Sequence, residues 1–515
     1  MKKMFESNNE HIEILSGELQ QNINCIIALT GNSSDFVIRK FQGANGLPMA
    51  IVYINGLTDT ELINDNIINP ILSDVEANTV QSRTLHEFFS VIKDKVITVN
   101  GTNTVSKIDD LISALYKGDT VILADGWDEA ISASSAKWVQ RGVEEPSSQS
   151  VIRGPKDGFT ENISTNVALL RRRIKSPKLW KIDRKIGLVT QTDVSVMYLK
   201  GTADDSVVNE VLQRLDRIEI DGILESGYIE EFIQDQTLTP FPTIINTERP
   251  DTVAASILEG QVAVLVDGTP FVLVMPITFL KFFIASEDYY QRFDISSFLR
   301  LLRVFAFAIS MVLPSLYIAI TTFHQEMIPT TLLVSLAAQR EGVPFPAFFE
   351  ALMMELIFEV LREAGVRMPR AIGSAISIVG ALVLGQAAVE AGFVSAAMVI
   401  VVAFTAISNF VVPAFNISIA ARLIRFILMI LAAVLGLFGI LSGLFFIIIH
   451  LLSLRSFGVP YMAPIAPFVP SNLKDSLVRV PWWMMVTRPR LFSKNNNVRQ
   501  NVNVRPETSD KEKEK

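Results

Sequence analysis

Two glutamates one helical turn apart stand out in the segment PFPAFFEALMMELIFEVLREAGV, residues 344–366. Steps of three and four residues place a common set of side chains on one face of a helix: Phe348, Leu352, Glu355, Glu359 and Arg362. Acidic side chains in a membrane bundle usually face a cavity or a water path. In a ring of identical subunits this face would present stacked rings of carboxylates, as cation pores do. The candidate pore-lining residues are this set and the adjacent Glu363.

The same pattern also fits an amphipathic helix that lies flat on a membrane surface, with its carboxylates in water. The opposite face is apolar and carries Ala351, Met354, Phe358 and Leu361. The residue pattern does not decide between the two placements. Whether residues 346–364 span the membrane or lie at its surface is therefore left open.

Four long apolar runs surround this helix, at about residues 301–322, 371–391, 394–412 and 426–452. About 20 apolar residues cross the ~30 Å hydrocarbon layer as a helix. Hydrocarbon offers no hydrogen bonds, so the backbone of such a segment must bond within itself. The sequence therefore predicts an α-helical, multi-span membrane domain over residues 295–455.

The basic residues do not give one consistent topology. If residues 346–364 span, the arginines near 367–370 and 422–425 lie inside, but the basic C-terminal tail lies outside, against the positive-inside rule. If they do not span, the tail is inside and those arginines are outside. The run 422–453 is too short for two full spans of about 20 residues each. We expect four full spans, with 346–364 partly inserted and both termini cytoplasmic.

Small residues recur in the later spans. Gly439 and Gly443 form a Gly-x-x-x-Gly motif, which lets two helices approach closely in a membrane. The motif predicts tight helix packing at these two glycines. It does not say whether the contact lies within one subunit or between subunits.

The residues before the membrane domain read as a soluble α/β region. AIVYINGLTD at 50–59 resembles SVMYLKGTAD at 195–204, and a second pair of segments matches at nearly the same offset. Repeated strand–turn–helix units predict two related α/β subdomains. The expected organisation follows the chain: an N-terminal helix or arm at 1–30, α/β subdomains at 31–150 and 186–290, a connecting helical region at 151–185, and a C-terminal cytoplasmic tail at 456–515 that is disordered after about 493.

The connecting region holds a basic cluster at the end of a predicted helix: Arg171, Arg172, Arg173 and Lys175. Cations favour the negative end of the helix dipole. They could also contact anionic lipid headgroups. We list the cluster as a candidate membrane-surface or partner contact, beside the simpler interpretation of a solvated helix end.

The composition excludes several functions. The 515 residues carry a net charge of −7, which does not suggest nucleic-acid binding, and the single cysteine, Cys25, excludes an internal disulfide. No His, Cys or carboxylate cluster has metal-ligand spacing, and no serine lies in a Gly-x-Ser-x-Gly elbow. We therefore predict no enzyme activity, no metal and no cofactor. The N-terminus lacks the apolar core of a signal peptide, so the α/β region is expected in the cytoplasm.

Three segments carry a family resemblance: residues 151–175 (VIRGPKDGFTENISTNVALLRRRIK), 342–392 (GVPFPAFFEALMMELIFEVLREAGVRMPRAIGSAISIVGALVLGQAAVEAG) and 410–426 (FVVPAFNISIAARLIRF). With them the chain resembles the A subunit of bacterial spore germinant receptors, from about residue 30 to 490. The resemblance implies a multi-pass protein of the spore inner membrane that works with a transporter-like, nutrient-binding B subunit and a lipoprotein C subunit. It also implies homo-oligomers that act as a ligand-gated cation channel, which makes the helix at 346–364 the pore candidate.

Two other functions are weighed against the channel. One is a non-conducting scaffold or signalling subunit of the same receptor. The other is a component of a membrane transporter, a class that usually has more spans and often an inverted repeat of broken helices. The sequence shows no internal repeat in its membrane region. It does not reveal the nutrient, the oligomer number or whether the α/β region binds a small molecule.

Overall fold

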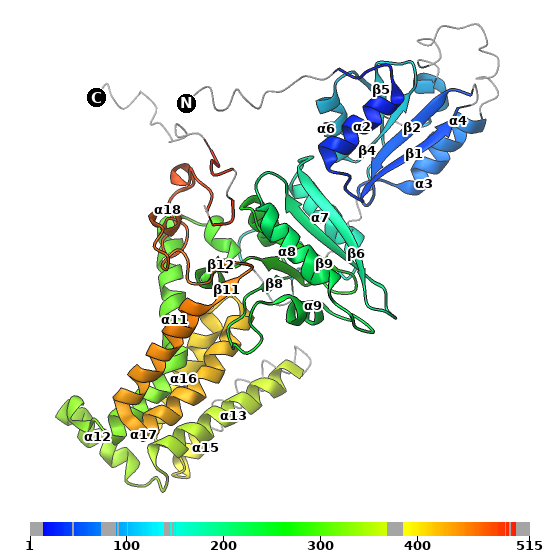
Figure 1. Ribbon diagram of the computed structural model, residues 1–515. Helices are drawn as coiled ribbons and strands as arrows, with labels where there is room; N and C mark the ends of the chain where they lie inside the picture. Colours follow the sequence, from blue (N-terminus) through cyan, green and yellow to red (C-terminus); the bar gives the residue numbers. More distant parts are fainter. Residues whose placement is uncertain are drawn as a thin grey trace, which may run out of the picture. The chain divides into compact units, whose positions relative to one another are not determined.

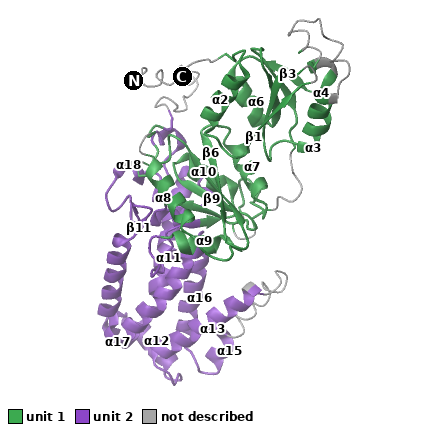
Figure 2. Cartoon of the chain, turned by 45° about the vertical axis from the view of Figure 1, so that its right-hand side comes forward, with its two compact units in different colours: residues 1–234, 246–276, 488–498 green, residues 235–245, 277–487, 499–515 purple. Residues whose placement is uncertain are grey.

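In the computed structural model the described residues are 14–43, 46–73, 89, 92–99, 101–137, 145–146, 149, 151–367, 385–489, 491–493 and 496–500. The chain forms two compact units (Figure 2). The first contains Met1–Gln234, Asn246–Pro276 and Arg488–Val498, and the second contains Asp235–Ile245, Ile277–Thr487 and Arg499–Lys515. The first unit is α/β and the second is mainly helical (Figure 1).

In the described part of the first unit there are two five-stranded sheets, and they have the same order of strands. The first is ordered β1-β2-β4-β5-β3 and the second β6-β7-β9-β10-β8. The strands of the first are β1 (Phe36–Gln42), β2 (Pro48–Ile54), β3 (Thr102–Val105), β4 (Asp119–Ala124) and β5 (Ala130–Ser134). Those of the second are β6 (Leu179–Ile186), β7 (Thr192–Leu199), β8 (Ile245–Thr247), β9 (Val262–Val266) and β10 (Val272–Met275).

The sequence match between residues 50–59 and 195–204 falls on β2 and β7, which occupy the same place in the two sheets. Each strand leads into a turn at a glycine with a positive φ, 85° at Gly56 and 80° at Gly201. Residues with a Cβ rarely adopt this conformation, so the paired glycines are required by the turn. The shared strand order agrees with the duplication inferred from the sequence.

Alternating side chains of β2 enter two different apolar clusters, as the two-residue period of a strand requires. Val52 packs with α2 (Leu19–Thr30) and α6 (Ile108–Lys117) on one face. Ile51 packs on the other face with α3 (Thr60–Ile63), η1 (Asn64–Ile68) and α4 (Asn69–Ser73). The helices that follow are α7 (Ile163–Arg173), α8 (Asp205–Asp216), α9 (Ser226–Ile233) and α10 (Pro250–Leu258). Residues 1–13 of the expected N-terminal arm lie outside the described residues.

The second unit contains the apolar helices. They are α11 (Phe293–Thr322), α12 (Thr330–Arg340), α13 (Ala347–Arg367), α15 (Gly385–Glu390), α16 (Ala396–Val411) and α17 (Phe415–Ser453). Among the described residues, α11 and α17 are long and apolar enough to cross a membrane. The run predicted at 394–412 is α16, a helix of 16 residues. Most of the run predicted at 371–391 lies outside the described residues.

Helix α17 is not one straight rod. Gly436 has φ 60° and ψ −139°, which no helix contains. A Cβ on Gly439 would lie 2.2 Å from the carbonyl oxygen of Leu431, and one on Gly443 would lie 2.5 Å from Leu428 Cδ2. In a continuous helix these pairs would be roughly 12 and 22 Å apart. The chain therefore turns back at Gly436 and forms a hairpin of two helical arms.

This hairpin corrects the expected single span at 426–452. We expected 422–453 to be too short for two crossings, but the helix already begins at Phe415. The arms measure roughly 30 and 25 Å, each close to the thickness of the hydrocarbon layer. The hairpin brings Leu454 and the tail to the end of the bundle where α11 begins: the Phe279 N–H donates to the Tyr461 carbonyl at 2.8 Å.

The C-terminal tail belongs to the second unit as far as Thr487. It contains β11 (Arg455–Ser456), β12 (Val459–Pro460), α18 (Pro470–Leu473) and the 3₁₀ turn η8 (Trp482–Met484). Two other 3₁₀ turns, η4 (Phe279–Phe283) and η5 (Ser286–Tyr289), precede α11, and η6 (Gln325–Met327) follows it. Of the residues after 493, for which we expected disorder, 494–495 and 501–515 lie outside the described part of the chain.

Candidate functional site

The two glutamates of α13 form ion pairs with two arginines of α17. Glu359 Oε2 lies 2.7 Å from Arg422 Nη1, and Glu355 Oε2 accepts a hydrogen bond from Arg425 Nη1. The glutamates are four residues apart and the arginines three, so each pair of like residues occupies one helix face. The result is a two-step ladder of opposite charges between the two helices.

The inner step of this ladder is fully buried. Glu355 is 0% exposed and Arg425 is 1% exposed. Burying two charges costs several kcal/mol per ion, which their attraction offsets only when the geometry is good. The second oxygen of Glu355 and two further nitrogens of Arg425 have no protein hydrogen-bond partner. Burial of the ladder therefore costs folding free energy, as is typical of functional polar groups in membrane bundles.

A third glutamate of α13 joins several helices. Glu350 is 0% exposed, and its Oε1 accepts from the Ser395 N–H at 2.6 Å and from the Ser395 hydroxyl. Ser395 is the N-cap of α16, and its hydroxyl lies 3.2 Å from the Tyr317 hydroxyl of α11. Arg340 Nε of α12 lies 4.0 Å from Glu350 Oε2. Sequence reasoning gave Glu350 no role, although a serine before an apolar helix is a recognisable N-cap signal.

The remaining residues of the predicted pore face have different surroundings. Phe348 and Leu352 are half-buried in an apolar cluster. The Arg362 guanidinium lies 5.7 Å from the centre of the Phe415 ring, and Glu363 forms an exposed pair with Arg367 at 2.6 Å. The structure brings Glu355, Glu359 and Arg362 together against α17 of the same chain. It does not place Glu363 with them.

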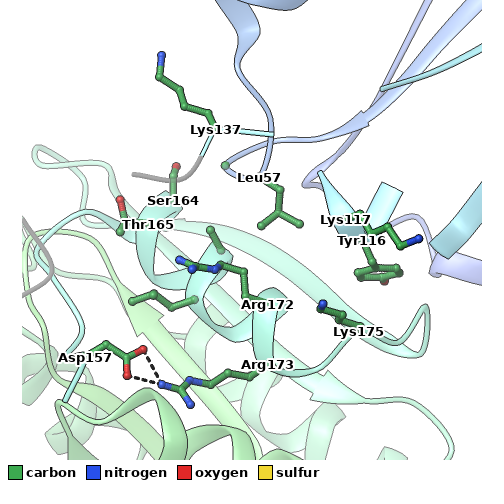
Figure 3. A pocket seen from close by; sticks show the side chains of 13 residues that line it. Leu57, Tyr116, Lys117, Lys137, Asp157, Ser164, Thr165, Arg172, Arg173 and Lys175 are labelled. Atoms are coloured by element: carbon green, nitrogen blue, oxygen red, sulfur yellow. Dashed lines mark hydrogen bonds and ion pairs between the residues drawn. The ribbon is translucent and has the colours of Figure 1, made fainter. Parts of the chain in front are cut away.

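A basic cleft of about 480 Å³ lies in the α/β unit (Figure 3). Its walls come from the turn after β2, the end of α6 and the exposed side of α7. The cationic side chains that line it are Lys117, Lys137, Arg172, Arg173 and Lys175. Two of them are paired with carboxylates: Arg173 with Asp157 at 2.5 Å and Lys137 with Asp59 at 3.1 Å. The basic lining as a whole suits a small molecule with a carboxylate or another anionic group.

Arg171, next to the cleft, is not a surface residue. It is 0% exposed, and its Nε and Nη2 donate to the two carboxylate oxygens of Asp35 at 2.7 and 2.8 Å. Its Nη1 donates to the Tyr116 hydroxyl at 3.2 Å. Burial raises the pKa of Tyr116 to about 12, so this hydroxyl keeps its proton and donates to the Ser176 carbonyl at 2.8 Å. The expected membrane-surface contact is wrong for Arg171, because helix α7 turns this residue inward.

Comparison with known proteins identifies the family. The family described as "Bacillus/Clostridium GerA spore germination protein" matches residues 24–491. The chain is 51% identical to spore germination protein KA of Bacillus subtilis over 504 residues, which cover 98% of this chain and 92% of the relative. It is 38% identical to spore germination protein A1 of the same organism, over 90% of this chain and 94% of the relative.

This chain belongs to the GerA family of spore germination proteins. The resemblance seen in residues 151–175, 342–392 and 410–426 is therefore confirmed. The GerA-family chain is also similar to a crystal structure of the N-terminal domain of the A subunit of the Bacillus megaterium germinant receptor GerK3, with 43% identity and a TM-score of 0.42. That similarity covers 52% of this chain and 99% of the other.

Sequence reasoning found the acidic residues of this GerA-family chain but not their partners. The apolar run expected at 426–452 leaves Arg422 and Arg425 just before its start. They lie within the first arm of α17, where Arg425 is buried. The signal that could have found them is their spacing of three residues, which places both arginines on one face of a helix, as the four-residue spacing does for Glu355 and Glu359.

Proposed function

We propose that the chain is the A subunit of a spore germinant receptor, and that copies of it assemble in the spore inner membrane into a nutrient-gated cation channel. The observation that carries this proposal is the buried pair of Glu355 with Arg425 in an apolar bundle. Family membership supports the receptor role. The acidic face of α13 supports the conducting role, because carboxylates attract cations in a pore.

The ion pairs suggest how such a channel stays closed. While Glu355 and Glu359 are paired with arginines, their charges are neutralised and their carboxylates face α17. Separation of α13 from α17 would expose the carboxylates to water and to the axis of an oligomer. Opening is then a displacement of α13 that breaks two ion pairs, and closing reforms them.

The assembly includes other components. In this proposal a transporter-like B subunit binds the nutrient, and a lipoprotein C subunit completes the receptor. The multi-span bundle lies in the membrane, and the α/β unit and the tail are cytoplasmic. Arg172, Arg173 and Lys175, which line the basic cleft, remain the candidates for contact with a partner or with lipid. Gly439 and Gly443 lie against the first arm of α17, so their close approach serves packing within one chain.

One observation favours the second candidate, a non-conducting scaffold or signalling subunit. Glu355 faces an arginine of its own chain and is 0% exposed, so it lines no surface of the single chain. In a scaffold the ladder would only join α13 to α17. The two candidates differ in one measurable property, which is cation flux through the chain.

The test is potassium efflux from vesicles that contain the chain together with its B and C subunits. Nutrient-dependent efflux is expected, and Glu359→Gln should change its rate and its selectivity among monovalent cations. Glu363→Gln, which removes an exposed charge from the same helix, serves as the control. Efflux that is absent, or that is identical in Glu359→Gln and the unmodified chain, would favour the scaffold.

A further inference from the structure

The C-terminal tail contacts both segments that lead from the α/β unit into the helical unit. One of these is Asp235–Ile245, and the other begins at Ile277. We call residues 450–482, from the end of α17 to the turn η8, the tail segment. This segment contains several prolines, and the proposed channel mechanism assigns it no role.

The first connecting segment, Asp235–Ile245, is held along its length. The hydroxyl of Ser456 donates to the Thr243 carbonyl at 2.7 Å, and the Tyr461 hydroxyl donates to the Pro242 carbonyl at 2.7 Å. At its near end the Phe457 N–H donates to the Asp235 carboxylate at 2.5 Å, and His450 Nε2 lies 2.8 Å from the Thr239 hydroxyl.

Ser456 and Tyr461 also bind the second connecting segment, which begins at Ile277. The Ile277 N–H donates to the Ser456 hydroxyl at 3.0 Å, so this one hydroxyl bonds both segments. The Phe279 N–H donates to the Tyr461 carbonyl at 2.8 Å. Ser456 and Tyr461 are both 0% exposed. Buried groups with satisfied hydrogen bonds on several sides fix the relative positions of what they join.

Farther along, the tail segment reaches the base of α11. Arg300 of α11 donates from Nη1 to the Asp475 carbonyl at 2.8 Å and lies 3.1 Å from its carboxylate. Arg300 Nε also donates to Asp288 at 3.1 Å, and Arg303 Nη1 donates to the same carboxylate at 2.8 Å. Arg300 and Asp288 are each 1% exposed. The start of the first long apolar helix is thus tied to the tail segment by the buried Arg300 and by Ser297, whose hydroxyl donates to the Arg479 carbonyl and accepts from the Arg479 N–H.

We infer that the tail segment is the element that transmits movement from the α/β unit to helix α11, with Ser456 and Asp475 as its positioning residues. A displacement of either connecting segment pulls on Ser456 and Tyr461, and the tail passes it to Arg300 through Asp475. Since Arg300 lies on α11, the displacement reaches the bundle that contains the α13–α17 ladder. This inference rests on the proposed receptor function, but it does not depend on which subunit conducts ions.

The test uses spores in which this receptor is the only nutrient receptor, with the full-length chain and its partner subunits. The probe is a mixture of L-alanine, D-glucose and inosine, and germination is followed by the loss of light scattering. Asp475→Asn and Ser456→Ala should raise the half-maximal nutrient concentration at least roughly fivefold, which is the lower range for a lost coupling between sites. Immunoblots of the inner membrane should show an unchanged amount of chain.

Two variants make the test specific. Asp475→Glu keeps the charge and should restore most of the response. Asp294→Asn removes an exposed acid at the start of the same helix, where it pairs with Arg292, and should behave like the unmodified chain. An unchanged half-maximal concentration in Asp475→Asn would overturn the inference. So would a loss of response that follows only from a smaller amount of chain.

The outcome is separable from the fate of the channel proposal. If reconstituted vesicles show no cation flux while Asp475→Asn spores lose nutrient sensitivity, the channel proposal fails and the inference stands. If the vesicles conduct and Asp475→Asn spores respond normally, the inference fails alone.

Discussion

Arg171 and Asp35 lie 136 residues apart in the sequence and form a two-point ion pair inside the α/β unit. Arg171 comes from α7, next to the second sheet, and Asp35 precedes β1 of the first sheet. The guanidinium also lies 5.4 Å from the centre of the Phe36 ring. One buried side chain therefore joins the two duplicated halves, through charge, hydrogen bonds and an aromatic contact.

The first prediction concerns this pair. Asp35→Asn should lower the free energy of unfolding by roughly 3–5 kcal/mol, because it leaves the Arg171 charge buried without its partner. The measurement is urea unfolding of the detergent-solubilised chain, followed by tryptophan fluorescence. Asp216→Asn breaks the exposed pair with Arg184 and should cost less than about 1 kcal/mol. An equal loss of unfolding free energy in the two variants would show that the buried pair stabilises the chain no more than the exposed pair does.

The second prediction concerns the ladder between α13 and α17. Glu355→Leu alone should destabilise the chain by roughly 3–5 kcal/mol, because Arg425 then lies buried and unpaired. The double variant Glu355→Leu, Arg425→Leu should recover most of that stability, since it leaves no buried charge. The two variants are compared by thermal unfolding in detergent. The readout is the amount of protein that keeps its monodisperse peak in fluorescence-detected size-exclusion chromatography after heating. A double variant that is no more stable than the single one would contradict the paired arrangement.

Much of the architecture follows from the sequence because it depends on local periodicity. The short continuous apolar run of β2 and the three-to-four-residue pattern of α13 predict these elements directly. The duplication is also visible, because both halves repeat the same strand, glycine and turn at 50–59 and 195–204.

The features that the sequence does not reveal depend on contacts between distant residues. The apolar run after Phe415 has the same composition whether it is one helix or a hairpin, and only the conformation of Gly436 distinguishes the two. In the sequence, Arg171 stands in a basic run that looks like an exposed cluster. In the structure its side chain is buried against Asp35. The partners of Glu355 and Glu359 lie 70 and 63 residues away, beyond the reach of any local pattern.

The third prediction concerns the turn of the hairpin. Gly436→Ala should strongly reduce the amount of folded chain, for two reasons. Its backbone lies close to a region that essentially only glycine adopts. A Cβ there would also lie 2.8 Å from His324 Cε1. The yield of monodisperse protein from membranes is the measurement.

The matched control for the hairpin is Gly342→Ala, because a Cβ at Gly342 would meet nothing within 4 Å. This variant should give the normal yield. A normal yield from Gly436→Ala as well would indicate that the apolar run continues as a single helix through residue 436.

The fourth prediction concerns pH and Glu230 of α9. The pKa of this carboxyl is raised to about 7, chiefly by burial and also by the charges of Glu225 and Glu231, while a hydrogen bond from Asn246 opposes the rise. In the unfolded chain the pKa returns to its ordinary value of 4.5. Between pH 4.5 and 7 the folded state therefore binds a proton that the unfolded state does not. The stability from this group is fully present below pH 4.5 and is lost as the pH rises to about 7.

Each unit of raised pKa corresponds to about 1.4 kcal/mol, so the loss amounts to roughly 3 kcal/mol at most. Glu230→Gln keeps a neutral side chain of the same shape and should remove this part of the pH dependence, making the variant more stable than the unmodified chain above pH 7. The measurement is the difference in unfolding free energy between the two chains from pH 4 to 8, which cancels the contributions of all other groups. Glu219→Gln is the control, because Glu219 is an exposed carboxyl that is not among the groups that shift the pKa of Glu230. A difference that does not change across this range would mean that Glu230 titrates alike in the folded and unfolded states.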